Sequence, residues 1–247
     1  SVQRARALHQ RMRSLIDAIE GGAFGEVRHL LHIGIGGSAL VPDLLIDALG
    51  RHAARYDVAV VSNVDGAALQ AVFDRFDPAT TLIAIASKTF TTTETMLNAE
   101  SALGWLRDHG VADPHGRVVA LTAYPDKAVA WGVDETRILP FAETVGGRYS
   151  LWSSIGFPAA LALGWDGFAD MLEGAAEMDR HVRLTDGAAN VALLAACVDQ
   201  LYAGRLGCQT RAVFAYDERL RLLPSYLQQL EMESNGKAVD LAGQALA

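Results

Sequence analysis

The stretch His-Leu-Leu-His-Ile-Gly-Ile-Gly-Gly-Ser, residues 29–38, joins a short apolar run to a glycine-rich turn. The apolar run has the length of a strand that is buried on both faces, and residues 40–49 after it have the length of a helix. A strand that passes through such a turn directly into a helix is typical of parallel α/β folds. This stretch therefore predicts the first strand and helix of such a fold.

The same alternation continues along the chain. Apolar strand-like runs occupy residues 57–62, 81–86, 118–122 and 137–141, and segments of helix length occupy residues 67–76, 94–107 and 126–131. Strands that are apolar throughout need cover on both faces of their sheet. The pattern therefore predicts an α/β fold with a doubly wound, five-stranded parallel sheet.

Beyond Gly146-Gly147 the pattern changes to a mainly helical one, over residues 151–163, 167–181 and 188–203. Residues 211–216 then predict a new buried strand, and residues 224–235 the helix after it, with a proline in the first turn where its missing N–H does no harm. We therefore expect two domains. Residues 1–160 form the first α/β domain, and residues 161–247 form a helical connection and the incomplete start of a second α/β domain.

Composition excludes several classes of protein. Half of the chain is hydrophobic (51%), yet no run of about 18 apolar residues predicts a membrane span. Twenty-nine acidic against 21 basic residues give a net charge of -8, so neither a nucleic acid nor an anionic membrane is an expected partner. Cys197 and Cys208 form no metal-binding or disulfide motif, which favours a cytoplasmic protein without a metal. Both chain ends resemble cuts, so we expect a fragment.

The glycine-rich turn is the first candidate binding site. Glycines let the backbone turn sharply, and the free N–H groups and the positive end of the helix dipole favour an anion there. A phosphate would fit this turn. Gly34, Gly36 and Ala39 also fit the fingerprint of a dinucleotide site. Taken alone, the turn leaves three interpretations open: a dinucleotide, another phosphate ligand, or a tight turn only.

A second candidate site follows the strand at residues 81–86. Residues 87–95 contain a run of hydroxyl side chains, among them Ser87, Thr89 and Thr92, with Lys88 supplying a positive charge. Ligands in open α/β sheets bind at the carboxyl ends of strands, so this loop and the glycine-rich turn can share one phosphate. Helix capping explains one or two of these residues but not the whole run. The pattern favours phosphate binding.

Four segments together resemble one family. They are residues 34–38, 87–92, 146–153 (Gly-Gly-Arg-Tyr-Ser-Leu-Trp-Ser) and 222–237 (Leu-Leu-Pro-Ser-Tyr-Leu-Gln-Gln-Leu-Glu-Met-Glu-Ser-Asn-Gly-Lys). In this order they resemble the phosphoglucose isomerase family. The resemblance implies sugar-isomerase-type domains and the reversible conversion of glucose 6-phosphate to fructose 6-phosphate, a step of glycolysis and gluconeogenesis, without metal or cofactor.

The resemblance also implies residue roles. It makes Arg148 the group that stabilises the intermediate, Glu233 the catalytic base and Gln229 a substrate contact, and it assigns phosphate binding to Gly37, Ser38, Ser87, Lys88, Thr89 and Thr92. Chemistry agrees, because one carboxylate can move a proton between neighbouring carbons through a cis-enediol. Glu231 and Glu233 point about 200° apart on a helix, so only one of them can face the substrate.

Part of the family's site is expected to lie elsewhere. The family uses a histidine from the partner subunit of a homodimer for ring opening, and a lysine near its C-terminus; neither falls within residues 1–247. We interpret the seven histidines of the chain as ordinary surface or core residues and expect the fragment alone to have little activity. The alternative is a non-catalytic sugar-phosphate-binding regulatory domain, which would need neither Arg148 nor Glu233. A nucleotide-dependent dehydrogenase comes third.

Overall fold

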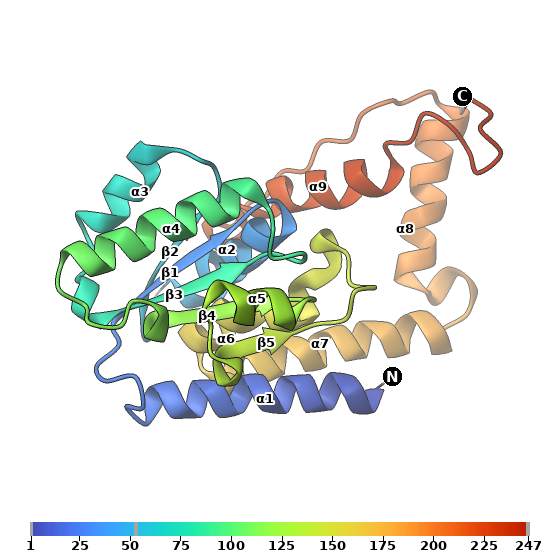
Figure 1. The fold of residues 1–247 in the computed structure, drawn as a ribbon. Helices are drawn as coiled ribbons and strands as arrows, with labels where there is room; N and C mark the ends of the chain where they lie inside the picture. Colours follow the sequence, from blue (N-terminus) through green and yellow to red (C-terminus); the bar gives the residue numbers. More distant parts are fainter. Residues whose placement is uncertain (1, 52–53, 246–247) are drawn as a thin grey trace.

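The computed structural model describes residues 2–51 and 54–245. Its centre is a five-stranded parallel sheet in the order β2-β1-β3-β4-β5 (Figure 1). The strands are β1 (His29–Gly34), β2 (Asp57–Val61), β3 (Thr81–Ala86), β4 (Val118–Thr122) and β5 (Ile138–Pro140). The order runs outward from β1 in both directions. The predicted doubly wound sheet is therefore confirmed, with its switch point between β1 and β3.

Helices cover both faces of this sheet. The α-helices of the described residues are α1 (Val2–Glu20), α2 (Gly37–Gly50), α3 (Gly66–Phe73), α4 (Thr93–Asp108), α5 (Pro125–Trp131), α6 (Phe157–Leu163), α7 (Trp165–Leu184), α8 (Val191–Gln200) and α9 (Leu223–Asn235), of which α8 does not cover the sheet. Successive strand side chains point to opposite faces. Leu31 and Ile33 of β1 accordingly pack with α3 and α4, and Leu30 packs with α1 and α6. Figure 1 shows α4 and α1 on opposite sides of the sheet.

Local sequence accounts for where these elements begin and end. Every residue of β3 and β4 is buried, as expected of apolar runs in the middle of a parallel sheet. Pro125 begins α5, at a position where a missing N–H breaks no helical hydrogen bond, and Gly132 ends it with a φ of +115°. The predicted helix over residues 151–163 forms only from Phe157, because two 3-10 turns precede it.

The predicted strand at residues 211–216 is wrong. These residues form no strand, and their side chains are exposed, with Tyr216 98% accessible. A strand is stable only when a neighbour satisfies its backbone groups, and no other strand of the described chain lies beside this segment. The helix predicted after this segment does form, as α9. For residues 211–216, the sequence correctly indicated an apolar run but predicted the wrong conformation for it.

Residues 185–245 form what we call the C-terminal arm. Asn190 is the only buried residue in it. Figure 1 shows α8 standing away from the sheet, while α9 returns to the vicinity of α2. The domain boundary at residue 160 stays a prediction; Phe168 of α7 belongs to the same core as α1 and α6. Within residues 2–51 and 54–245, none of the helices is long and apolar enough to span a membrane.

Candidate active site

Two glycines shape the turn between β1 and α2. Gly36 has a φ of +57°, which side chains rarely tolerate. A Cβ on Gly37 would lie 2.2 Å from the carbonyl carbon of Gly147, so the start of α2 packs directly on the backbone of the 3-10 turn Gly147–Trp152. The glycines predicted to approach a ligand thus also bring two backbone segments together.

The amides of this turn are not all free. The Ser38 amide donates to the carbonyl of Ile35 (3.1 Å), whereas the amides of Gly36 and Gly37 donate to no backbone carbonyl in the described part of the chain. The Ser38 side chain is half-buried. An anion at this turn would therefore meet two glycine amides and the Ser38 hydroxyl.

The loop between β3 and α4 carries the predicted hydroxyl groups in two linked pairs. The Ser87 Oγ lies 3.0 Å from the Thr92 Oγ1, and the Thr91 hydroxyl donates to the Thr89 Oγ1 at 2.9 Å. Ser87 is buried and Thr92 half-buried, while Thr89 and Thr91 are exposed. The Ser87–Thr92 pair thus lies inside the loop, and the Thr89–Thr91 pair lies at its exposed rim.

Phe90 holds this loop in an unusual conformation. It is the one non-glycine residue with a positive φ (+52°) among those the structure describes, and its side chain is buried. Such a conformation carries local strain and persists only where surrounding contacts fix it. One such contact lies two residues before Phe90, where the Thr122 hydroxyl donates to the Lys88 carbonyl at 3.0 Å. The Lys88 side chain remains exposed.

The two loops leave neighbouring strands at the same edge of the sheet. Gly34 at the end of β1 pairs with Ala86 at the end of β3. This is the switch point of the sheet, where open α/β folds bind ligands. The two loops therefore begin side by side, and we call them the phosphate loops (residues 34–38 and 87–92) after the ligand that the sequence predicts for them.

Arg148 and Glu233 meet beside these loops. The Arg148 Nη1 lies 3.1 Å from the Glu233 Oε1, with side chains that are 21% and 52% exposed, respectively. The Arg148 Nε donates to the Ser234 hydroxyl (2.7 Å), and the Tyr226 hydroxyl donates to the Arg148 carbonyl (3.3 Å). The ion pair, the Ser234 hydrogen bond and a cation–π contact with Tyr149 (4.9 Å to the ring centre) thus hold the guanidinium next to the carboxylate, while Tyr226 holds the Arg148 backbone.

Gln229 links α9 to the glycine-rich turn. Its Nε2 lies 2.8 Å from the position that a Cβ on Gly36 would take. Its Oε1 is buried and has no hydrogen-bond partner among the described residues. Gln229 lies one helical turn before Glu233 and so on the same side of α9. A free acceptor at this place fits a substrate hydroxyl.

Sequence reasoning missed how α9 is fastened. Asp47 of α2 pairs with Arg221 (2.8 Å), just before α9, and with Arg51 (2.9 Å). The hydrogen bond from Arg221, followed by that from Arg51, holds the pKa of the Asp47 carboxyl below its usual range, against the opposing effect of burial. No motif marks this cluster, because Asp47 and Arg221 are 174 residues apart in the sequence.

His32 was interpreted as an ordinary histidine, and it is indeed buried in β1. Its Nε2 lies 2.6 Å from the Ser38 carbonyl, and its Nδ1 has no partner in the described part of the chain. Burial lowers the pKa of His32 to about 4, against the hydrogen bond to Ser38, which raises it. The neutral His32 imidazole thus contacts the backbone of the first phosphate loop from β1. His52 lies outside the described residues.

The fold is that of an α/β protein with two donor-rich loops at the switch point of its sheet and a paired carboxylate and guanidinium next to the first loop. The model of the family described as phosphoglucose isomerase matches residues 1–247, and the chain belongs to that family.

Named relatives agree with this membership. The chain is 78% identical over its full length to a glucose-6-phosphate isomerase of Sphingopyxis alaskensis and 69% identical over 98% of its length to that of Zymomonas mobilis. It covers 49% and 48% of these proteins, about half of their length. A solved glucose-6-phosphate isomerase structure from Chlamydia trachomatis has a TM-score of 0.87 at 28% identity, over 98% of this chain and 46% of that one.

Proposed function

We propose that this chain supplies the phosphate-binding and proton-transferring part of an enzyme that interconverts glucose 6-phosphate and fructose 6-phosphate. The pairing of Arg148 with Glu233 beside the phosphate loops is the observation that carries the proposal. The names of relatives at 78% and 69% identity support this substrate. A regulatory sugar-phosphate domain would need the loops but not the pair, so the pair favours catalysis.

The phosphate loops would hold the phosphoryl group. Hydroxyls of Ser38, Ser87 and Thr92 donate from half-buried or buried positions, and Thr89 and Lys88 stand at the exposed rim. Neutral donors in a partly dry site bind a dianion strongly, while the lysine adds charge where water can still reach it. Gly37 would contribute its amide, which donates to no backbone carbonyl in the described part of the chain, and its missing side chain makes room for the backbone of Gly147.

Glu233 would act as the base. Its Oε1 lies 3.1 Å from the Arg148 Nη1, and its carboxylate would accept the proton from C2 of the open-chain sugar and return it to C1. The negative charge that develops on the enediolate oxygens lies next to the guanidinium, whose position is already fixed by Ser234. Gln229, with its free Oε1, would orient a sugar hydroxyl.

Finer parts of the proposal follow from the family resemblance. In a chain of the relatives' full length, two subunits would form a homodimer in the cytoplasm, and the partner subunit would provide the histidine for ring opening. Neither metal nor cofactor takes part in this scheme, because proton transfer by a carboxylate suffices.

A matched pair of substitutions on α9 tests the proposal. In a protein that joins residues 1–247 to the second half of the Sphingopyxis alaskensis relative, Glu233→Gln should lower kcat by about 10²- to 10⁴-fold, because an amide cannot accept the proton. The affinity for fructose 6-phosphate should stay nearly unchanged. The control is Glu231→Gln, the same change two residues away, which should leave kcat within about twofold. Normal turnover of Glu233→Gln would assign the base to another residue.

A further inference from the structure

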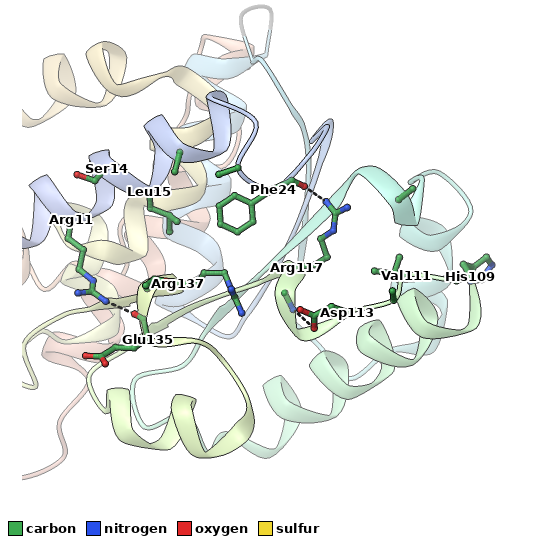
Figure 2. A pocket seen from close by; sticks show the side chains of 17 residues that line it. Arg11, Ser14, Leu15, Phe24, His109, Val111, Asp113, Arg117, Glu135 and Arg137 are labelled. Carbon is green, nitrogen blue, oxygen red and sulfur yellow. Dashed lines mark hydrogen bonds between the residues drawn. The ribbon is translucent and has the colours of Figure 1, made fainter.

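A second groove lies at the other end of the sheet. It has a volume of about 1040 Å³, at the upper end of the range for ligand pockets. Its walls come from α1 and from the segments that lead into β1, β3, β4 and β5 (Figure 2). The phosphate loops leave the carboxyl ends of the strands, whereas these segments enter the amino ends. The groove is therefore separate from the candidate active site.

Three arginines line this space, and we call it the arginine groove. Arg11 donates from its Nε to the first carbonyl of β5 (2.8 Å), and Arg137 donates from its Nε to the first carbonyl of β4 (3.2 Å). Arg117 donates from its Nη1 to the Phe24 carbonyl (2.9 Å). Each guanidinium is thus anchored to the backbone of another wall of the groove, and Figure 2 shows Arg137 between Arg11 and Arg117.

These hydrogen bonds to backbone carbonyls leave the positive charge and several N–H donors of the three guanidiniums without a partner in the described residues. A guanidinium has five N–H donors, and the Arg11 Nη1, the Arg137 Nη1 and the Arg117 Nη2 have no hydrogen-bond acceptor in residues 2–51 and 54–245. Within the same residues, none of the three arginines forms an ion pair with a carboxylate. Backbone carbonyls orient these guanidiniums without neutralising them.

The carboxylates in the groove do not balance this charge. Asp113 and Glu135 line it, so three permanent positive charges face two negative ones. The Asp113 carboxylate already accepts a hydrogen bond from the Gly116 amide (2.9 Å), and Glu135 is exposed. The chain as a whole has a net charge of -8. The local excess of positive charge is therefore a feature of the groove and does not reflect the overall charge of the protein.

Apolar side chains complete the groove. Leu15, Phe24 and Val111 line it together with the arginines (Figure 2). Ligand sites typically combine apolar walls with a few directed polar groups, and arginine matches carboxylate and phosphate oxygens through two parallel N–H donors. We propose that the arginine groove binds a small organic molecule with two or more oxyanion groups, carboxylates or phosphates. This site goes beyond the proposed isomerase activity and does not depend on it.

The experiment adds probes of both kinds to the 247-residue chain. Citrate and pyrophosphate are titrated at low salt while the Nε–Hε signals of the arginines are followed by NMR. We expect saturable shifts of Arg11, Arg117 and Arg137, with a Kd of about 1 mM or below, and no shift of the exposed Arg183. The relative strength of the two probes distinguishes a carboxylate from a phosphate ligand. Shifts of Arg148 report binding at the candidate active site separately.

Two substitutions on α1 decide between ligand binding and a purely structural role of the arginines. Ser14 is exposed and lines the groove, so Ser14→Glu should weaken binding of the probes about tenfold without touching an anchor. Ala5→Glu adds the same charge to the opposite side of α1, at another exposed position, and should change the Kd less than twofold. The proposal is overturned if neither probe gives saturable shifts, or if the two variants weaken binding equally.

Discussion

The sheet with its helices (residues 2–51 and 54–184, the body) and the C-terminal arm contain similarly apolar sequence but bury it very differently. In the body, Phe157 and Phe168 are completely buried between the sheet and its covering helices. In the arm, Phe214 is 75% exposed, and a stripe of large apolar side chains is exposed along α8 (Val191, Leu194 and Val198) and along the π-helical turn that continues it (Leu201 and Tyr202). An apolar side chain is buried only where a second apolar surface lies opposite it.

The candidate catalytic carboxylate stands where these two regions meet. α9 belongs to the arm, but Asp47 of the body holds Arg221 at its start, and Arg148 holds Glu233 and Ser234 near its end. A few polar contacts, together with Tyr226 of α9 packed against the small apolar cluster at Val41, Leu45 and Leu151, thus position Glu233. The geometry of the candidate site therefore depends on the weaker of the two regions.

The largest expected difference is between two Phe→Ala substitutions, one in the body and one in the arm. Phe157→Ala should lower the free energy of unfolding by about 3–5 kcal/mol, because it leaves a cavity in a closed core. Phe214→Ala removes the same atoms from an exposed position and should change it by less than about 0.5 kcal/mol. Urea unfolding followed by circular dichroism measures both. Equal losses would mean that the arm is packed as tightly as the body.

Acid should act on the body through His32. Its folded pKa of about 4 lies below the ordinary value of 6.5, so between these values the unfolded chain binds more protons than the folded one. Stability is then complete above about pH 6.5 and falls as the pH drops towards 4, by roughly 3 kcal/mol in total. Unfolding free energies measured between pH 7.5 and 4.5 test this. His32→Gln should flatten the dependence, and an unchanged slope in this variant would assign it to other groups.

The attachment of the arm should be weaker than the body but measurable. Asp47→Asn removes a mostly buried charge from Arg221 and Arg51, so opening of α9 should become easier by about 1–2 kcal/mol. Hydrogen exchange should then accelerate in α9 and remain unchanged in β3. Asp57→Asn is the control, because its pair with Arg75 is about half exposed on both sides and worth little. Faster exchange in β3 as well would mean that the two regions open together.

The same contrast explains how far the sequence could predict the molecule. β3 and β4 were predicted to the residue, because continuous apolar runs between helices have few other solutions. The run at residues 211–216 is also mainly apolar, but whether it forms a strand depends on a neighbour that local pattern does not reveal. The strand register brought the two phosphate loops together as expected.

For the candidate site, motifs and family resemblance identified Arg148 and Glu233 but not the contacts that support them. Asp47 and Arg221 meet only through the fold, and neither lies in a recognisable motif. His32 is one polar residue in an apolar run, and its contact with the Ser38 carbonyl depends on the turn that follows β1. Such contacts join positions that sequence periodicity cannot relate to one another.

The smallest expected change in stability accompanies a clear change in association. Leu194 in α8 and Leu97 in α4 are 49% and 52% exposed, so replacing either with Gln should alter the free energy of unfolding by less than about 0.5 kcal/mol. Only Leu194 lies within the exposed stripe of α8, and large contiguous apolar surfaces promote contact between molecules. Leu194→Gln should therefore reduce self-association of the 247-residue chain in sedimentation velocity at high concentration, whereas Leu97→Gln should not. If both variants associate like the unchanged chain, the stripe is not what brings the molecules together, and exposure in the arm has no consequence for the chain in solution.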